Sequence, residues 1–390
     1  MGKIYTPKEL LSVLIGFDTT SFRSNRDMID FIVDYLSSHG ISSSLGFNEE
    51  ETKADLVATI GPQVAGGIIL SGHTDVVPVA GQDWNTDPFV AQEKGDKIFG
   101  RGSCDMKGFI AVVLAMIPEI LKFNLKVPLH LAFSYDEEVG CLGAPALISR
   151  MLKDIAPPSA AIIGEPTGMK LVNAHKGGTM FETTITGCAG HASQTQNGVN
   201  AISLAGLCIS FLDKKAEEFK IKGPRDDRME PPYNTISIGT IEGGTAHNII
   251  AGSCKLVWGC RSIAKEDALS LMDEFINYCN REIIPPFKKI STDIEILTTE
   301  INGIPPLKAR ESNPAEELVL QLTGKNEILG VAFGTEAGLF DDAGIPSVVF
   351  GPGHIDQAHK PDEFVAISQL EECSLFIQKM AKWSAEQERR

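Results

Sequence analysis

Seven histidine and carboxylate side chains occupy positions from which a metal site could be built. They are His73, Asp75, Asp105, Glu137, Glu138, Glu165 and His359. Imidazole and carboxylate groups are the ligands that zinc and the neighbouring divalent metals accept. A single histidine or aspartate of this kind is more often a surface or capping residue, so the hypothesis depends on all seven occurring together.

Short apolar segments precede most of these positions. The segments are residues 68–70 before His73, 129–133 before Glu137, 160–163 before Glu165 and 348–350 before His359. Apolar segments of this length, bounded by glycine, are typical of buried parallel strands. Because active sites of open α/β sheets lie beyond the carboxyl ends of such strands, we expect these side chains to meet at one edge of a sheet.

Length, composition and charge limit the class of protein. The chain has 390 residues, of which 43% are hydrophobic and 22% are charged, as in ordinary globular proteins of two domains. The formal net charge of −16 argues against nucleic acid or an anionic membrane as a partner. No apolar segment approaches the roughly 18–20 residues that cross a bilayer.

Targeting signals and cysteine usage lead us to expect a cytoplasmic protein. The first residues resemble a helix start rather than a signal peptide, with Thr6 as N-cap, Pro7 in the first turn and Glu9 completing a capping box. The eight cysteines include no Cys-x-x-Cys pair, so we expect reduced and mostly buried thiols.

The order of expected elements predicts an α/β protein with an inserted domain. Helices expected at 25–38, 108–123 and 144–153 alternate with the strands, which predicts a mostly parallel sheet covered by helices on both faces. Residues 176–298 instead follow a strand–helix–strand–strand–helix–strand order, which is ferredoxin-like. We therefore expect a catalytic domain at 1–175 and 299–390 and an inserted α+β domain at 176–298.

Five motifs in register resemble one known family. They are SGHTD at 71–75, GRGSCDMKG at 100–108, DEE at 136–138, GEPT at 164–167 and GHAS at 190–193. Together they resemble the aminoacylase/carboxypeptidase family of zinc-dependent amidohydrolases. The resemblance extends over nearly the whole chain and implies a helix-covered, metallopeptidase-like catalytic domain with an inserted lid and dimerisation domain.

The resemblance implies two divalent metal ions, with zinc expected and cobalt or manganese also compatible with the ligands. His73 and Glu165 would hold one ion, Glu138 and His359 the other, and Asp105 would bridge them. Asp75 lies two residues beyond His73, where a carboxylate could orient the imidazole.

The resemblance also implies roles in catalysis. Glu137 would be the general base that deprotonates the attacking water and returns the proton to the leaving amine. His191 would reach the active site of a partner subunit and stabilise the oxyanion, so a homodimer through the inserted domain is expected. Residues 194–196 depart from the family, which usually has a proline after this histidine.

Three further residues are candidates for substrate binding. Asn248 and Arg261 would bind a substrate α-carboxylate, and Glu336 would pair with a substrate ammonium group. Segments 334–337 and 351–363 resemble those of family members that convert N2-acetyl-L-ornithine to L-ornithine and acetate in arginine biosynthesis. An N-acyl amino acid of this kind is therefore the expected small-molecule substrate.

Other functions stay open at this point. A relative that removes succinyl or formyl groups, or a dipeptidase or carboxypeptidase, would use the same metal site. A non-catalytic binding protein on this fold is less favoured, because it has no need of a base such as Glu137. The glycine pairs at 100–102 and 351–353 lack the third glycine of a dinucleotide-binding motif.

Overall fold

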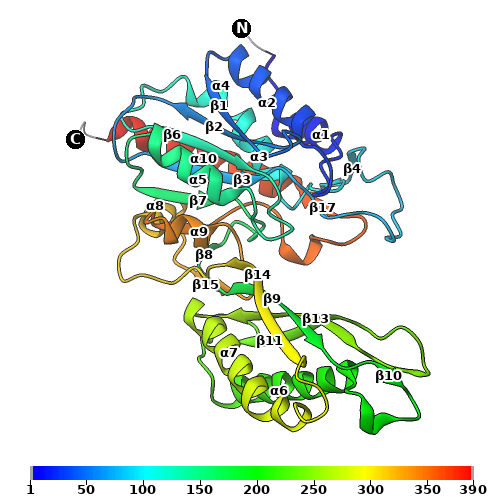
Figure 1. Cartoon of the computed structure of the whole chain (residues 1–390). Coiled ribbons are helices and arrows are strands. Elements are labelled where there is room, and N and C mark those ends of the chain that lie inside the picture. The colour runs from blue at the N-terminus through cyan, green and yellow to red at the C-terminus, as the bar shows by residue number, and fades with distance from the viewer. Residues whose placement is uncertain (1–2, 388–390) are drawn as a thin grey trace. The chain divides into compact units, whose positions relative to one another are not determined.

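The computed structural model describes residues 3–387 and divides into two compact units (Figure 1). The first unit runs to Ala174 and also includes Ala309–Leu329 and the chain from Thr335 onward. The second unit comprises His175–Lys308 and Gly330–Gly334. The outer domain limits expected from the sequence, residues 1 and 390, lie outside the described residues.

An eight-stranded sheet forms the centre of the first unit. In spatial order its strands are β1 (Ser43–Phe47), β2 (Ala54–Ile60), β6 (Leu129–Ser134), β3 (Ile68–His73), β7 (Ala160–Ile163), β16 (Ser347–Val349), β8 (Leu171–His175) and β15 (Ile328–Val331). The four central strands, β6, β3, β7 and β16, pair in parallel. They correspond to the four apolar segments expected to be buried parallel strands, although β16 ends at Val349, one residue before the expected end, so that prediction is confirmed.

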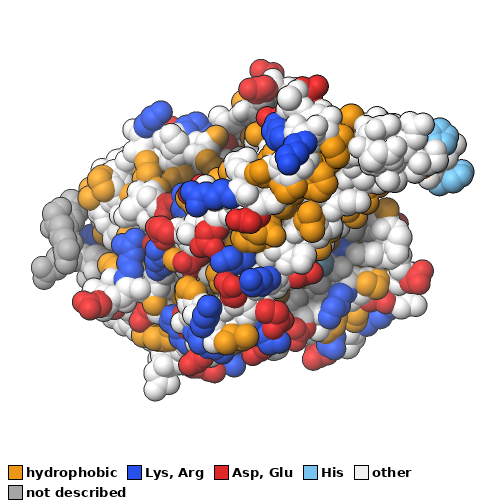
Figure 2. Space-filling view, turned by 60° about the horizontal axis from the view of Figure 1, so that its bottom comes forward, with side chains coloured by type: hydrophobic (Ala, Val, Ile, Leu, Met, Phe, Trp, Pro, Cys, Tyr) orange, Lys and Arg blue, Asp and Glu red, His pale blue; other side chains and the backbone are white. Residues whose placement is uncertain are grey.

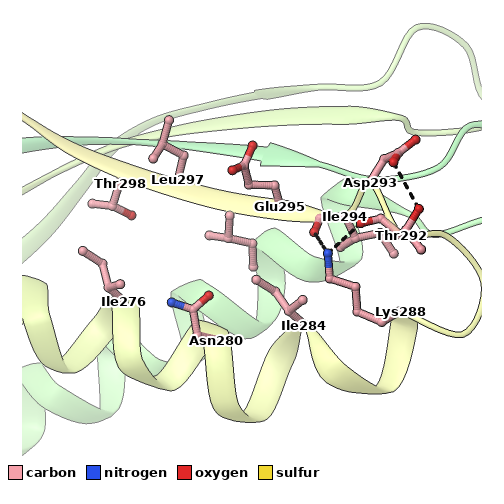
Figure 3. Close-up of a pocket in the computed structure, with 11 residues that line it drawn as sticks. Ile276, Asn280, Ile284, Lys288, Thr292, Asp293, Ile294, Glu295, Leu297 and Thr298 are labelled. Carbon is pink, nitrogen blue, oxygen red and sulfur yellow. Dashed lines mark hydrogen bonds between the residues drawn. The ribbon is translucent and has the colours of Figure 1, made fainter.

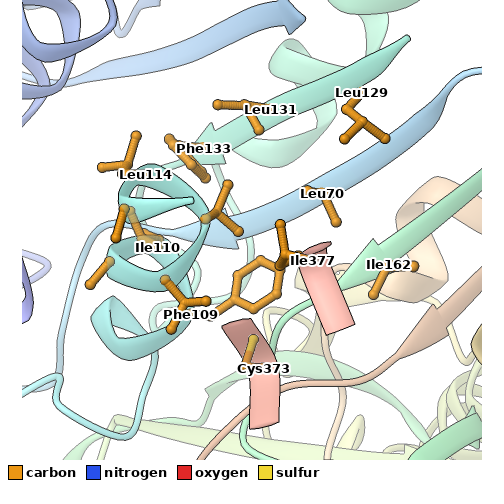
Figure 4. Packing of buried hydrophobic residues seen from close by; sticks show 14 of the residues in the cluster. Leu70, Phe109, Ile110, Leu114, Leu129, Leu131, Phe133, Ile162, Cys373 and Ile377 are labelled. Atoms are coloured by element: carbon orange, nitrogen blue, oxygen red, sulfur yellow. The ribbon is translucent and has the colours of Figure 1, made fainter. Parts of the chain in front are cut away.

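Helices cover this sheet. They are α1 (Pro7–Ile15), α2 (Arg26–Ser38), α3 (Lys107–Ala115), α4 (Ile117–Ile120), α5 (Ala144–Asp154), α8 (Pro314–Thr323), α9 (Ala337–Asp342) and α10 (Ile367–Glu386). Figure 4 shows α3 and α10 packed against the sheet through a layer of buried apolar side chains. Its labelled members include Leu70, Leu131, Ile162, Phe109, Ile110, Cys373 and Ile377. This layer makes the sheet a rigid base for the loops at the strand ends.

Local sequence signals explain where several helices begin and end. Thr6 and Glu9 form the predicted capping box at the start of α1. The single helix expected over 108–123 is wrong, because the structure has α3 and the short α4 instead. Pro118 explains the interruption, since proline has no N–H to donate within a helix.

The second unit has the predicted ferredoxin-like order. Its main elements are β9 (Gly177–Thr186), α6 (Ala201–Lys222), β11 (Thr235–Gly243), β13 (Ser253–Ser262), α7 (Lys265–Tyr278) and β14 (Glu295–Ile304). The four strands form an antiparallel sheet in the order β11-β13-β9-β14. Alternate side chains of β9 are buried, as expected of a sheet that is covered on one face. The predicted fold class is therefore confirmed.

Smaller elements complete the two units. The first unit has a three-stranded sheet of β4 (Gln92–Lys94), β5 (Lys97–Phe99) and β17 (Phe364–Ala366), and a 3-10 helix, η4 (Ile355–Gln357). The second has β10 (Gly190–His191), β12 (Ile249–Ile250), the 3-10 helices η1 (Thr195–Asn197) and η3 (Pro285–Phe287), and a π-helical segment, η2 (Cys279–Ile283). β10 pairs with β12, which brings two separate loops together.

The distribution of charged side chains and the state of the cysteines can be compared with what the composition predicted. Figure 2 shows one face of the molecule, on which acidic and basic side chains are interspersed with hydrophobic ones. All eight cysteines lie in the described part of the chain and are free, and seven of them are buried. None of the helices formed by residues 3–387 combines the length and apolar character that a membrane crossing requires.

Candidate metal centre

Parallel pairing brings the predicted metal ligands of the first unit together. β3 ends at His73, which lies opposite Ser134 at the end of β6, so the loop with Glu137 and Glu138 begins beside it. β7 pairs with the other side of β3, and Glu165 follows two residues after its end. The strand ends therefore place these side chains at one edge of the sheet, as the sequence predicted.

Asp105 lies between the two histidines. Its Oδ1 is 3.1 Å from Nε2 of His73, and its Oδ2 is 3.3 Å from Nε2 of His359. One carboxylate thus presents a separate oxygen to each imidazole, which is the arrangement that a ligand bridging two cations requires.

Each histidine has a further carboxylate beside it. Nε2 of His359 is 2.9 Å from Oε2 of Glu138, and Nε2 of His73 is 3.7 Å from Oε1 of Glu165. Among the described residues, the buried Oε1 of Glu138 has no hydrogen-bond partner. The site thus offers two imidazole nitrogens and three carboxylates, one of which has a buried oxygen without a hydrogen-bond partner. This set of ligands fits a pair of divalent cations.

The ring of His73 has a defined orientation. Its Nδ1 is 3.0 Å from the backbone carbonyl of Asp75 and 3.5 Å from that residue's Oδ1. The nearer acceptor is thus the carbonyl rather than the carboxylate that the sequence pointed to. A proton held on Nδ1 leaves Nε2 free to bind a cation on the side of Asp105.

The carboxylate of Asp75 holds the loop that follows β6. Its Oδ1 accepts from the backbone N–H of Glu137 at 3.0 Å, and its Oδ2 from that of Glu138 at 3.3 Å. The hydroxyl of Ser21 also donates to Oδ2, at 2.8 Å. Asp75 therefore positions both glutamates through their backbone as well as lying beside His73.

Glu137 lies against the His73 side of the site. One ligand atom each of Glu137, His73 and Glu165 lie within 4.8 Å of one another, as do those of His73, Asp105 and Glu138. The thiol of Cys141 donates to Oε1 of Glu137 at 3.4 Å. Glu137 is thus placed to receive a proton from a molecule bound between these groups.

Several side chains of the site have pKa values above their usual range, whereas for Asp105 burial is outweighed by hydrogen bonds to His359 and His73, which lower its pKa. Burial raises the pKa of Glu137 to about 8 and that of Glu138 to about 7. Hydrogen bonds to Asp105 and Glu138 raise the pKa of His359 to about 10. Burial opposes protonation of His73, but hydrogen bonds to Asp105 and Asp75 hold its pKa well above the usual range. A bound cation would therefore displace protons.

Two other predicted residues lie in the second unit, on paired segments. His191 is exposed, and its Nδ1 is 2.7 Å from the hydroxyl of Ser193. Asn248 is also exposed, and its backbone carbonyl accepts from Ala192 N–H at 3.0 Å. The short β10–β12 ladder therefore brings His191 and Asn248 into one loop cluster.

Arg261 lies on the open face of the second unit's sheet. It pairs with Gly178 across β13 and β9, and a Cβ at that glycine would lie 2.4 Å from Nη1 of Arg261. Only glycine leaves room for the guanidinium group in this position. Arg261 is an exposed residue, as binding of a carboxylate requires.

Glu336 is enclosed within the first unit. The residue is 1% exposed, and its carboxylate accepts hydrogen bonds from the hydroxyls of Ser134 and Ser71. Burial raises the pKa of this carboxyl. Its predicted pairing with a substrate ammonium group stays a prediction, and these contacts also favour a role in holding β3 and β6 in place.

A cavity of about 520 Å³ in the second unit carries none of the predicted site residues. It lies beside β14 and the end of α7 (Figure 3). Apolar side chains such as Ile276 and Ile284 line it, and Lys288 donates to the backbone carbonyls of Thr292 and Ile294. Because the ammonium group of Lys288 is already engaged, the cavity has no evident role in catalysis.

Sequence reasoning missed a set of residues that hold the ligands. Glu363, Arg101 and Gln82 connect the loops that carry Asp105 and His359. Arg101 and Glu363 are each 1% exposed. Both stand in segments that resemble family motifs, but nothing in the sequence shows that they contact each other.

Comparison with curated proteins shows full-length relatives. Acetylornithine deacetylase of Pasteurella multocida (strain Pm70) is 33% identical over 387 residues, which cover 97% of this chain and 98% of the relative. Acetylornithine deacetylase of Myxococcus xanthus is 32% identical over 374 residues, which cover 94% of each protein. These identities over nearly the whole length indicate shared ancestry and leave the substrate to be tested.

Comparison with solved structures shows the same fold. An M20 family metallo-carboxypeptidase from Sulfolobus solfataricus superposes with a TM-score of 0.75 at 18% identity, covering 98% of this chain and 100% of that one. The model of peptidase family M20/M25/M40 matches residues 69–383. The chain therefore belongs to peptidase family M20/M25/M40, whose metal-dependent hydrolases use a dinuclear metal centre.

Proposed function

We propose that this protein hydrolyses the amide bond of an N-acyl amino acid, N2-acetyl-L-ornithine, to L-ornithine and acetate. The observation that carries the reaction class is Asp105 between His73 and His359, with Glu137 alongside. The substrate is supported by the name of the full-length relatives and by the motifs at 334–337 and 351–363.

His73, Glu165, Glu138 and His359 would hold two divalent cations, with Asp105 between them. Zinc is the expected metal, and cobalt suits the same ligands. Such a pair supplies a nucleophilic water at neutral pH and polarises the acyl carbonyl. The raised pKa values of the free ligands are consistent with a site that exchanges protons for cations.

Glu137 would carry the proton through the reaction. The water oxygen adds to the acyl carbon while Glu137 takes one of the water's protons. The C–N bond then breaks, and Glu137 delivers that proton to the amine nitrogen, which leaves as free ornithine. Asp75 assists by fixing the backbone of Glu137 and the neighbouring Glu138.

The second unit would bind the substrate carboxylate and complete the site of a second subunit. Arg261 and Asn248 are the groups proposed for the carboxylate, and His191 for the oxyanion in the partner's site. A dimer is supported by β11, an edge strand whose residues are largely exposed. Ile241 on β11 and Ile202 on α6 are 49% and 43% exposed, so an apolar surface is available for a second copy.

Acetate release from N2-acetyl-L-ornithine tests the proposal. Purified protein is stripped of metal with a chelator, then reloaded with zinc or cobalt, and each form is assayed. We expect metal-dependent release well above that from N-acetylmethionine, and above succinate release from succinyl-diaminopimelate. Metal-dependent hydrolysis of another acyl amino acid instead would support the proposed reaction but reject N2-acetyl-L-ornithine as its substrate.

A second candidate function is cleavage of a peptide bond. It is favoured by the match to peptidase family M20/M25/M40, and the same carboxylates and histidines would serve for this reaction. A panel of dipeptides in the same assay separates the two functions. If two metals bind but neither amides nor peptides are cleaved, a binding protein becomes the better interpretation.

A further inference from the structure

Glu363 is a buried carboxylate whose oxygens are fully engaged by one loop. Its Oε1 accepts from the backbone N–H groups of Cys104 at 2.8 Å and Asp105 at 3.0 Å. Its Oε2 accepts from Gly102 N–H at 3.1 Å and from Nη1 of Arg101 at 2.7 Å. Contacts to the N–H groups of residues 102, 104 and 105 therefore define the shape of the loop that presents Asp105.

The shape of this loop needs such support. Gly102 has a φ of +80°, and a Cβ there would lie 2.8 Å from Val76 and 2.9 Å from Lys107. Residues 101–105 are all buried, so their backbone N–H groups require an acceptor within the protein. A carboxylate supplies two acceptor atoms, whereas the amide of glutamine supplies only one.

A second set of contacts extends from the same carboxylate to His359. Nη2 of Arg101 donates to Oε1 of Gln82 at 2.5 Å, and Nε2 of Gln82 donates to the backbone carbonyl of His359 at 3.0 Å. Nη1 of Arg101 also reaches the carbonyl of Lys360, at 3.4 Å. His359 itself has a φ of +62°, a conformation that a residue with a side chain rarely keeps without external contacts.

We propose that Glu363, acting with Arg101 and Gln82, is a positioning residue that holds Asp105 and His359 at the spacing needed to bind one of the two cations. The inference rests on the proposed function only in requiring that this site binds metal. Two of the three ligands at the His359 site, Asp105 and His359, depend on this hydrogen-bond network. At the other site two of the three ligands, His73 and Glu165, are placed by the ends of β3 and β7 instead, so the shared Asp105 is the one ligand there that depends on the network.

The test is a calorimetric titration of metal-free, full-length protein with Zn²⁺ and with Co²⁺. Wild-type protein should show two binding events, and His359→Ala identifies which event belongs to the His359 site. Glu363→Gln should weaken that event about 10–100-fold, the usual effect of removing a group that orients a ligand. The other event should weaken by a smaller factor, because one of its three ligands, the shared Asp105, depends on the network. Gln82→Ala should weaken the same event by a smaller factor.

Glu93→Gln is the matched control, because the side chain of this glutamate is 51% exposed and forms an ion pair with Lys8 at the surface. It should leave both events unchanged. Equal weakening of both events by Glu363→Gln, or no weakening, would overturn the proposal and leave the proposed function standing. If Glu363→Gln does not fold, an unchanged His359 event in Gln82→Ala overturns it. Wild-type protein that binds fewer than two ions would instead reject the two-metal centre itself.

Discussion

The carboxylate of Asp75 accepts a hydrogen bond from the backbone N–H of Glu137, with Oδ1 3.0 Å from that nitrogen. Asp75 follows β3 and Glu137 follows β6, so this contact connects the ends of two parallel strands. The same aspartate lies beside the ring of His73 through its carbonyl and carboxylate oxygens. One residue therefore positions both a proposed metal ligand and the proposed general base.

Replacing Asp75 should therefore affect two properties at once. Asp75→Asn keeps the size of the side chain but places an amide group against the N–H donors of residues 137 and 138. We expect a loss of about 10–100-fold in metal affinity and a larger loss in kcat. Titration of metal together with steady-state kinetics measures both. A change in kcat with metal affinity unaltered would contradict the contact with His73.

Glu137→Gln should separate chemistry from metal binding. Glu137 is not one of the proposed metal ligands, so metal content measured by elemental analysis should equal that of wild type. Turnover should fall by at least about 10²–10⁴-fold, because glutamine cannot accept the proton. Retained turnover would remove the general-base role. Glu93→Gln again serves as an exposed control of the same chemical change.

Metal-free protein should lose stability as the pH rises. Folding raises the pKa of Glu137 to about 8, of Glu138 to about 7 and of His359 to about 10. A group whose pKa is raised on folding stabilises the folded state below its unfolded value and loses that contribution as the pH rises through its folded value. The Tm of metal-free protein should therefore be several degrees lower at about pH 9 than at about pH 6.

Added zinc or cobalt should reverse this trend, because cations replace the protons and bind more tightly when the ligands are deprotonated. His359→Ala should reduce the slope measured without metal between about pH 7 and pH 10. Thermal unfolding at a series of pH values, with and without metal, provides both measurements. A Tm of metal-free protein that rises over this pH range would contradict the raised pKa values of Glu137, Glu138 and His359.

Glu336→Ala distinguishes a substrate contact from a structural one. Pairing with the ammonium group of acetylornithine predicts that KM for this substrate rises far more than KM for N-acetylmethionine. The enclosed carboxylate, held by Ser71 and Ser134, predicts instead a similar loss on both substrates and a lower Tm. Equal effects on the two substrates would reject the ammonium role.

Arg261→Lys should weaken substrate binding more than turnover. Lysine keeps the charge but loses the planar fork that contacts two carboxylate oxygens. We expect KM to rise about tenfold, with metal affinity unchanged. Gly178→Ala should have a similar effect, since its Cβ would displace Nη1 of the arginine. An unaltered KM in both variants would show that the substrate carboxylate does not bind to Arg261.

Much of the fold was accessible from the sequence because its signals are local. Apolar segments such as 68–70 and 160–163 formed the predicted parallel strands, since their burial on both faces requires a continuous apolar character. The alternation in β9 identified a sheet with one covered face. The one wrong helix prediction, at 108–123, could have been avoided, because Pro118 within that range indicates an interruption of the helix.

The sequence also determined which residue types could bind metal and roughly where they would meet, because strand ends in a parallel sheet share one edge. Only the tertiary structure decided the individual contacts. These include the two oxygens of Asp105 facing different histidines, the enclosure of Glu336 and the network from Glu363 to His359. Such contacts join residues up to 277 positions apart, so they depend on how the loops fold over one another and not on local pattern.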